Sequence, residues 1–144
     1  MTLTTRYPFS ASHRLHAASL SERENQQIYG KCNNPFGHGH NYWIELTVRG
    51  EADPVTGMIV ERKRLDRLMH QEILPHVQHR DLNAELKELN GLVPTTENLA
   101  LVLAKLIDAG WPAHFPEQSV RFERIRIHET KNNRFEMEAD EVRE

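Results

Sequence analysis

Hydrophobic and polar residues alternate along two stretches of the chain, and this alternation predicts two β-strands. One stretch covers residues 3–13 and the other covers residues 38–48. Because successive side chains of a strand point to opposite faces of a sheet, each stretch has one apolar face suited to a core. His13 falls on the apolar face at the end of the first stretch, and His38 and His40 fall on that of the second.

Two later segments show the spacing of amphipathic helices. Apolar side chains recur every three or four positions over residues 65–73, where the pattern stops at Pro75, and again over residues 99–107. A hydroxyl cap precedes the second segment, and Gly110 followed by Pro112 predicts its end. Both predicted helices have an apolar stripe that can cover one face of a sheet.

Shorter apolar patterns predict further strands. Residues 58–60 form a short apolar run, residues 120–129 alternate, and residues 135–137 follow a turn. The order of elements predicts an α+β fold in which an antiparallel sheet is covered on one face by two helices. No internal repeat or second domain is visible, so residues 1–144 are expected to form a single domain.

The other segments are more polar. Ser21, followed three residues later by Glu24, favours a short helix over residues 21–28. The mixed pattern of residues 76–92 predicts mainly loop. The charged residues 138–144 predict a frayed end of the chain.

Composition narrows the class of protein. A chain of 144 residues with 38% hydrophobic residues can form a core without disulfides, and its single cysteine indicates a reducing compartment. It shows neither a signal-peptide pattern nor an apolar run of roughly 20 residues, so we expect a cytoplasmic protein with no membrane partner. The formal charge of -3 and the scattered Lys and Arg residues argue against a nucleic-acid partner.

The three histidines on the strand faces suggest a metal site. If the two strands pair antiparallel, His13 comes to lie next to His38 and His40. Three neutral imidazoles on one side of a sheet match a catalytic zinc site, whose fourth position is open for water or substrate. The alternative is a set of half-buried histidines with ordinary hydrogen-bond partners. The position of His13 on the matching face favours the metal site.

Cys32, the only cysteine, lies six residues before His38. It is close enough to reach the same cavity, but the loop between them gives no basis for assigning it as a ligand. A thiol beside a cation or metal has a lowered pKa and can act as a base or nucleophile. The alternative is an inert thiol, which is less expected for a cysteine in a polar loop.

Five motifs, in order, are similar to those of the 6-pyruvoyl-tetrahydropterin synthase family, which also includes 6-carboxytetrahydropterin synthases. They span roughly residues 7–135 and read FSASHRL from Phe9, YGKCNNPFGHGHNY from Tyr29, DPVTGM from Asp53, TTEN from Thr95 and HETKNN from His128. The resemblance implies the T-fold (tunnelling fold), in which three chains form a barrel and two trimers stack into a homohexamer with active sites between subunits. Open sheet edges need such partners.

The resemblance also implies a catalytic centre. Its zinc ligands would be His13, His38 and His40. Zinc would bind the vicinal oxygens of the pterin side chain and acidify the adjacent C–H and O–H bonds. Cys32 and His79 would then move protons.

A substrate pocket follows from the same resemblance. Glu129 would anchor the pterin ring, because a carboxylate can accept two hydrogen bonds from a paired donor edge. Three residues at the start of the second helix would line this pocket: Thr95, Thr96 and Glu97. From the residues alone, Thr95 has the alternative role of a helix cap and Glu129 that of a surface acid.

One position departs from the family pattern. The family uses an Asp-His pair, contributed by a neighbouring subunit, as the relay partner of the cysteine, whereas this chain has Gln78 and His79. A neutral amide can orient an imidazole but cannot offset imidazolium charge. Asp81 lies two residues further on, but its position in a predicted loop gives no basis for assigning it this role.

Three functions are open at this point. The first is conversion of 7,8-dihydroneopterin triphosphate to 6-pyruvoyl-tetrahydropterin with loss of triphosphate. The second is the sister reaction to 6-carboxytetrahydropterin, on the queuosine route. The six-residue interval from Cys32 to His38 resembles the pyruvoyl-forming enzymes and favours the first. The third is a pterin-binding homologue with little catalysis because of Gln78, against which the retained thiol and histidines argue.

Overall fold

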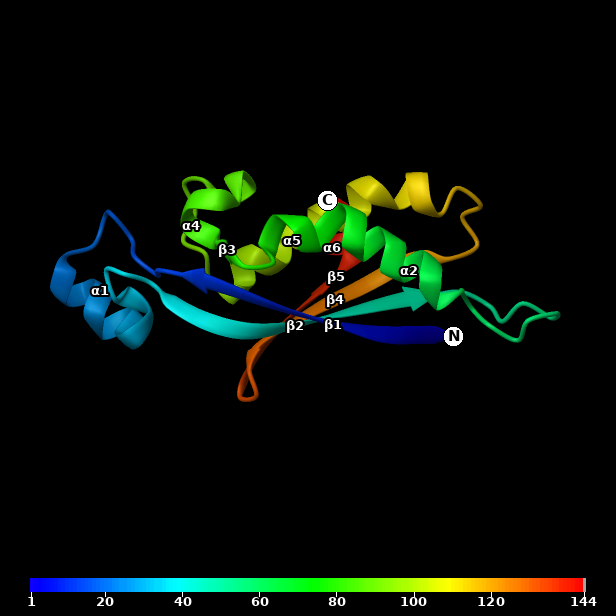
Figure 1. Ribbon diagram of the computed structural model, residues 1–144, viewed down its shortest axis with the longest axis horizontal. Helices are drawn as coiled ribbons and strands as arrows, with labels where there is room; N and C mark the ends of the chain where they lie inside the picture. Colours follow the sequence, from blue (N-terminus) through cyan, green and yellow to red (C-terminus); the bar gives the residue numbers. More distant parts are fainter. Residues whose placement is uncertain (144) are drawn as a thin grey trace.

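The computed structural model describes residues 1–143, which form a five-stranded sheet with helices over one of its faces (Figure 1). The strand order is β3-β1-β2-β4-β5. The strands are β1 (Thr2–His13), β2 (His38–Arg49), β3 (Arg80–Asp81), β4 (Arg121–Thr130) and β5 (Asn133–Glu138). The helices are α1 (Glu22–Tyr29), α2 (Arg62–Leu68), α3 (Leu74–Val77), α4 (Leu82–Glu85), α5 (Thr96–His114) and α6 (Ala139–Arg143). There are also two short 3₁₀-helices, η1 (Gly30–Asn33) and η3 (Lys87–Leu89), and one π-helical segment, η2 (Met69–Ile73).

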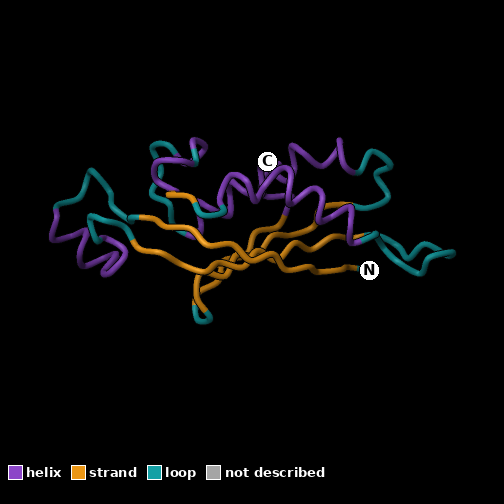
Figure 2. Tube along the Cα trace, viewed as in Figure 1, coloured by secondary structure: helices purple, strands orange, loops and turns teal. Residues whose placement is uncertain are grey.

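The two long strands pair as the alternation predicts. β1 and β2 run antiparallel along their whole length, with His13 opposite His38 and Ala11 opposite His40. Figure 2 shows the strands as one layer and most helices as a second layer on the same side, with α1 beyond one end of the sheet. The sheet face under the helices supplies much of the core, which includes Tyr7, Phe9, Tyr42, Ile44, Leu46, Leu99, Leu103, Ile107, Ile125 and Ile127. The α+β prediction is therefore confirmed.

The prediction of a strand over residues 58–60 is wrong. Ile59 and Val60 form a bend, and Met58 ends a local turn over residues 53–58 that is closed by donation from Asp53 N to Met58 O at 2.9 Å. A different short strand, β3, lies inside the segment predicted as loop and pairs in parallel with Ala11 and Ser12. The sheet is thus antiparallel except for β3.

Both helix ends predicted from proline are also wrong. The first helical segment continues past Pro75, because this residue is the second residue of α3, where its missing N–H costs little. The second, α5, continues through Gly110 and Pro112 to His114. A Cβ on Gly110 would lie 3.1 Å from Cγ of Glu72, so the glycine allows close packing against η2 instead of ending the helix. No helix in residues 1–143 is long and apolar enough to cross a membrane.

The end of the chain is more ordered than predicted. Glu138 ends β5, and residues 139–143 form α6 with Ala139 buried. Arg143 fixes this helix to α5, because its guanidinium donates to Asp108 at 3.0 Å. Glu144, also part of the predicted frayed end, lies outside the described residues.

Candidate metal and catalytic site

The end of β1 and the start of β2 meet beside α1, at one end of the molecule (Figure 1). Antiparallel pairing brings the histidines of the two strands together, and the end of β4 brings Glu129 to the same place. Cys32 comes from η1, directly after α1. Ligand atoms of His13, Cys32, His40 and Glu129 all lie within 4.8 Å of one another. These four side chains could hold a metal ion.

Glu129 contacts both imidazoles of this group. Its Oε1 lies 3.0 Å from His40 Nε2 and 3.9 Å from His13 Nε2. Cys32 Sγ lies 3.9 Å from His40 Nε2. The four side chains therefore offer two imidazole nitrogens, a sulfur and a carboxylate oxygen, a donor set that suits zinc.

His13 is oriented for metal binding. Its Nδ1 lies 2.9 Å from the carbonyl oxygen of Pro94, and donation of the Nδ1 proton there leaves Nε2 as the free nitrogen. Nε2 is buried and makes no hydrogen bond within residues 1–143. A buried nitrogen without a partner is costly, and a metal ion would satisfy it.

The surroundings keep both imidazoles neutral. Burial lowers the pKa of His13 and of His40, and this outweighs the opposite influence of the Glu129 carboxylate. Neutral imidazole is the form that binds a metal. Burial, with a further contribution from Glu129, raises the pKa of the Cys32 thiol, so the thiol keeps its proton at neutral pH in the metal-free chain.

His38 lies beside the group rather than in it. Its ring centre is 4.6 Å from that of His40, but its nitrogens are not among the clustered ligand atoms. The structure thus brings together two of the three predicted zinc ligands and adds Cys32 and Glu129. The role of His38 as a ligand stays a prediction.

The start of α5 contacts Glu129 directly. Thr96 is buried and its Oγ1 donates to Glu129 Oε2 at 2.5 Å, while Asn133 Nδ2 donates to the same oxygen at 3.3 Å. Thr95 caps α5 by accepting from Asn98 N, and Glu97 is exposed in the first turn. The contact between Thr96 and Glu129 joins the two parts of the predicted pterin pocket, and the sequence contained no local signal for it.

Two asparagines fix the loop that carries Cys32. Asn25 is fully buried, donates to the carbonyl oxygens of Ala17, Leu20 and Ser21, and accepts from Ala17 N. Asn33 donates to Leu15 O at 2.8 Å, next to the bond from Leu15 N to Cys32 O. Neither role follows from a local pattern. Asn33 bonds Leu15, which is distant in the chain, and Asn25 bonds an irregular turn whose shape the sequence does not indicate.

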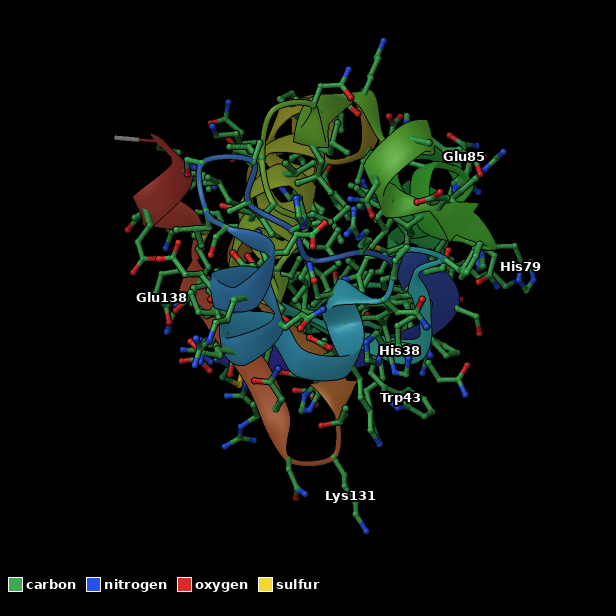
Figure 3. The ribbon with its side chains drawn as sticks, turned by 90° about the vertical axis from the view of Figure 1, so that its left-hand side faces the viewer. His38, Trp43, His79, Glu85, Lys131 and Glu138 are labelled. Carbon is green, nitrogen blue, oxygen red and sulfur yellow. The ribbon has the colours of Figure 1, made fainter. Side chains whose placement is uncertain are left out.

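Gln78 and His79 lie on the far side of β1 from the metal group. His79 is exposed and is not part of the group. It points away from the body of the protein in Figure 3, whereas His38 lies at the start of β2. The structure therefore does not bring His79 to Cys32 within one chain.

Comparisons with known proteins identify relatives over nearly the whole chain. Residues 2–140 match the sequence model of a family described as 6-pyruvoyl tetrahydropterin synthase. The 6-pyruvoyl tetrahydrobiopterin synthase of Poecilia reticulata is 45% identical over 87% of this chain and 81% of its own. The 6-carboxy-5,6,7,8-tetrahydropterin synthase of Rickettsia typhi is 24% identical over 90% of this chain and 94% of its own. The structure of Caenorhabditis elegans 6-pyruvoyl tetrahydropterin synthase superposes with a TM-score of 0.82 at 34% identity, covering 96% of this chain and 94% of that one.

Proposed function

Because the chain belongs to the 6-pyruvoyl tetrahydropterin synthase family, we propose that it converts 7,8-dihydroneopterin triphosphate to 6-pyruvoyl tetrahydropterin with loss of triphosphate. The observation that carries this proposal is the group of His13, Cys32, His40 and Glu129. A binding module would need no thiol beside a metal group, whereas proton transfer does.

The donor set supports zinc as the metal. His13 and His40 supply neutral nitrogens, and the buried, unpartnered Nε2 of His13 needs a partner. His38, next to His40, would complete three histidine ligands, which leaves one position open. Bound zinc would supply Lewis-acid stabilisation of the charge that develops on the substrate.

The side chains around the metal group divide the remaining tasks. The Cys32 thiol would move a proton. It lies 3.9 Å from His40 and is only partly exposed, so it lies at the edge of the metal group where substrate would bind. Glu129 would accept N–H groups of the pterin ring. Thr96 and Asn133 hold one of its oxygens, so the direction of the carboxylate is fixed before substrate binds. Thr95 and Glu97, at the start of the same helix, would line the pocket.

The sister reaction to 6-carboxytetrahydropterin is the second candidate. It would use the same residues, so the site geometry does not separate the two. The higher identity to a pyruvoyl-forming relative than to the carboxy-forming one favours the first reaction.

Product analysis tests the proposed function. Zinc-loaded protein is incubated with 7,8-dihydroneopterin triphosphate and the products are identified by mass, with chelator-treated protein as the control. A pyruvoyl product that depends on the metal is the expected result. A carboxy product would instead support the second candidate, and absence of turnover would support a pterin-binding homologue.

We propose further that the chain assembles as the homohexamer of the T-fold, a dimer of trimers. Two features support this. Within residues 1–143, the edges of the sheet at β1 and β5 are open along most of their length, and open edges need partners. His79 lies away from Cys32 of its own chain, so only a second copy could bring these two side chains together.

A further inference from the structure

Gln78 and His79 are attached to the edge of β1 through a single residue, Ser10. The side-chain oxygen of Gln78 accepts from Ser10 N at 2.8 Å, and His79 N donates to Ser10 O at 2.7 Å. The N–H and the C=O of Ser10 on this edge are thus both hydrogen-bonded. The Gln78 side chain takes the place of a backbone carbonyl and begins the parallel pairing that β3 continues.

This attachment fixes an unfavourable backbone conformation. His79 has φ 57°, in the left-handed region, which residues other than glycine adopt uncommonly, although histidine does so more often than most. The two bonds to Ser10 hold the chain just before the φ bond of His79, and the pairing of β3 with Ala11 and Ser12 holds it just after that bond. Loss of the Gln78 bond would leave the His79 N–H as the one bond to Ser10 before the φ bond, so the backbone that directs the imidazole would be held less firmly.

The nearby acids are occupied. Asp81 accepts from Asn83 N at 3.0 Å and caps α4. Glu85 accepts from the Arg80 guanidinium at 3.0 Å and from Asp81 N at 3.1 Å. Within residues 1–143 neither carboxylate bonds to His79, so the placement of His79 depends on the backbone.

His79 also borders a groove of about 550 Å³ along the edge of the sheet, lined in part by Ser10, Ser12 and Asn41. By strand alternation these three residues lie on the face opposite to the inward-facing side chains of His13 and Tyr42. His79 therefore borders a groove on the outer face of the sheet edge, where a second copy of the chain could reach the imidazole; His40 also lines this groove.

We propose that Gln78 is a positioning residue for His79. Its hydrogen bond to the β1 edge fixes the direction of the imidazole, which replaces the orientation that an acid beside the histidine would give. This inference rests on the proposed function, because His79 acts only if the chain catalyses proton transfer. On this view Gln78 matters through its hydrogen-bond acceptor and not through charge.

Three variants test this role in the zinc-loaded protein, with kcat and KM measured on 7,8-dihydroneopterin triphosphate. Gln78→Ala removes the acceptor, and we expect kcat to fall about tenfold or more with KM within about twofold, because misdirected catalytic groups mainly slow the chemical step. Gln78→Glu keeps an acceptor at the same reach and should retain kcat within about threefold. Gln71→Ala, which changes an exposed glutamine of η2, is the matched control and should be unchanged.

A double variant separates positioning from a general loss of structure. In a His79→Ala background, with product followed over hours, adding Gln78→Ala should cause no further loss. Three results would overturn this role. The first is an unchanged kcat in Gln78→Ala, and the second is a kcat in Gln78→Glu as low as that of Gln78→Ala. The third is a lower kcat in the double variant than in His79→Ala alone. A wild-type chain that forms no pterin product would instead contradict the proposed function, so the two failures are distinguishable.

Discussion

At the scale of single residues, Cys32 carries the sharpest chemical assignment. Its sulfur is close enough to His40 to join the metal group, yet the proposed function gives it a proton to transfer and not a metal to bind. These two roles predict different behaviour when the sulfur is removed. His13 has a single role open to it, because Nε2, the nitrogen not bonded to Pro94, lies in the group.

We expect Cys32→Ala to retain zinc while turnover falls about 10²- to 10⁴-fold, the usual contribution of a positioned acid or base. Metal content by atomic absorption and product formation by mass spectrometry measure the two effects on one sample. Lys31→Ala, an exposed neighbour in the same turn, is the control for disturbance of the loop. Loss of zinc from Cys32→Ala would show that the thiol is a ligand.

At the scale of elements, α1 and the loop before it are stabilised by Asn25 more than by hydrophobic contacts. Asn25 is the only buried residue of α1 within residues 1–143, and it satisfies four hydrogen bonds to the preceding turn. The capping box of Ser21 and Glu24, predicted from the sequence, fixes the start of the same helix. The position of Cys32, at the far end of this unit, depends on both.

We expect Asn25→Ala to lower the free energy of unfolding by about 2 kcal/mol, because it leaves several buried backbone groups without partners. Thermal or urea unfolding measures the change. Gln26→Ala is the matched control, since Gln26 is exposed on the same helix and should change stability by no more than about 0.5 kcal/mol. Equal stability of the two variants would contradict the role of Asn25.

The helices show where local signals are overridden. Pro75 and Gly110 are ordinary signs of a helix end, yet both lie inside helical segments in the structure. The apolar residues that follow them explain this: Val77 and Trp111 are buried against the core, and burial is worth more than the local cost of the proline or glycine. Only packing against other elements could reveal this.

At the scale of the whole molecule, ion pairs cover the sheet face that the helices leave open. Arg49 forms a bidentate pair with Glu123, and Arg126 pairs with Glu45 and Glu136. Hydrogen bonding to Arg49 lowers the pKa of Glu123, and hydrogen bonding to Arg126 lowers that of Glu136. These carboxylates therefore bind protons less readily in the folded than in the unfolded state.

The sign of the pH dependence follows. A lowered folded pKa contributes stability above the unfolded pKa, and this contribution is lost as the pH falls through the folded pKa. We expect the melting temperature to fall as the pH is lowered below about 5, and less steeply at high salt, which screens exposed pairs. Calorimetry at two salt concentrations measures this. A fall of the same steepness in the Glu123→Gln variant would show that its pair does not contribute.

The proposed assembly predicts complementation between inactive chains. If each site takes Cys32 from one copy and His79 from another, hybrids of Cys32→Ala and His79→Ala chains contain some sites with both side chains. We expect hybrids that carry the tags of both chains to regain about a quarter of wild-type turnover. In a closed oligomer of randomly mixed chains, about a quarter of the sites have Cys32 from one copy and His79 from the other. Turnover no higher than that of the separate variants would contradict sites shared between subunits.

The sequence by itself determined the parts that depend on periodicity and local hydrogen bonding. The alternation of β1 and β2 set which side chains face the core, and antiparallel pairing then brought His13 beside His38 and His40. The caps of α1 and α5 were also readable, because a cap and its partner lie within one turn. The motif order indicated the family, which the comparisons confirm.

Only the tertiary structure decided the contacts between residues distant in the chain. It placed the carboxylate of Glu129 against His40, tied it to Thr96, and attached Gln78 to the edge of β1. A strand pattern states which face a residue occupies, but not which side chain of another element it meets there. That choice is made when the elements pack and every buried polar group must find a partner.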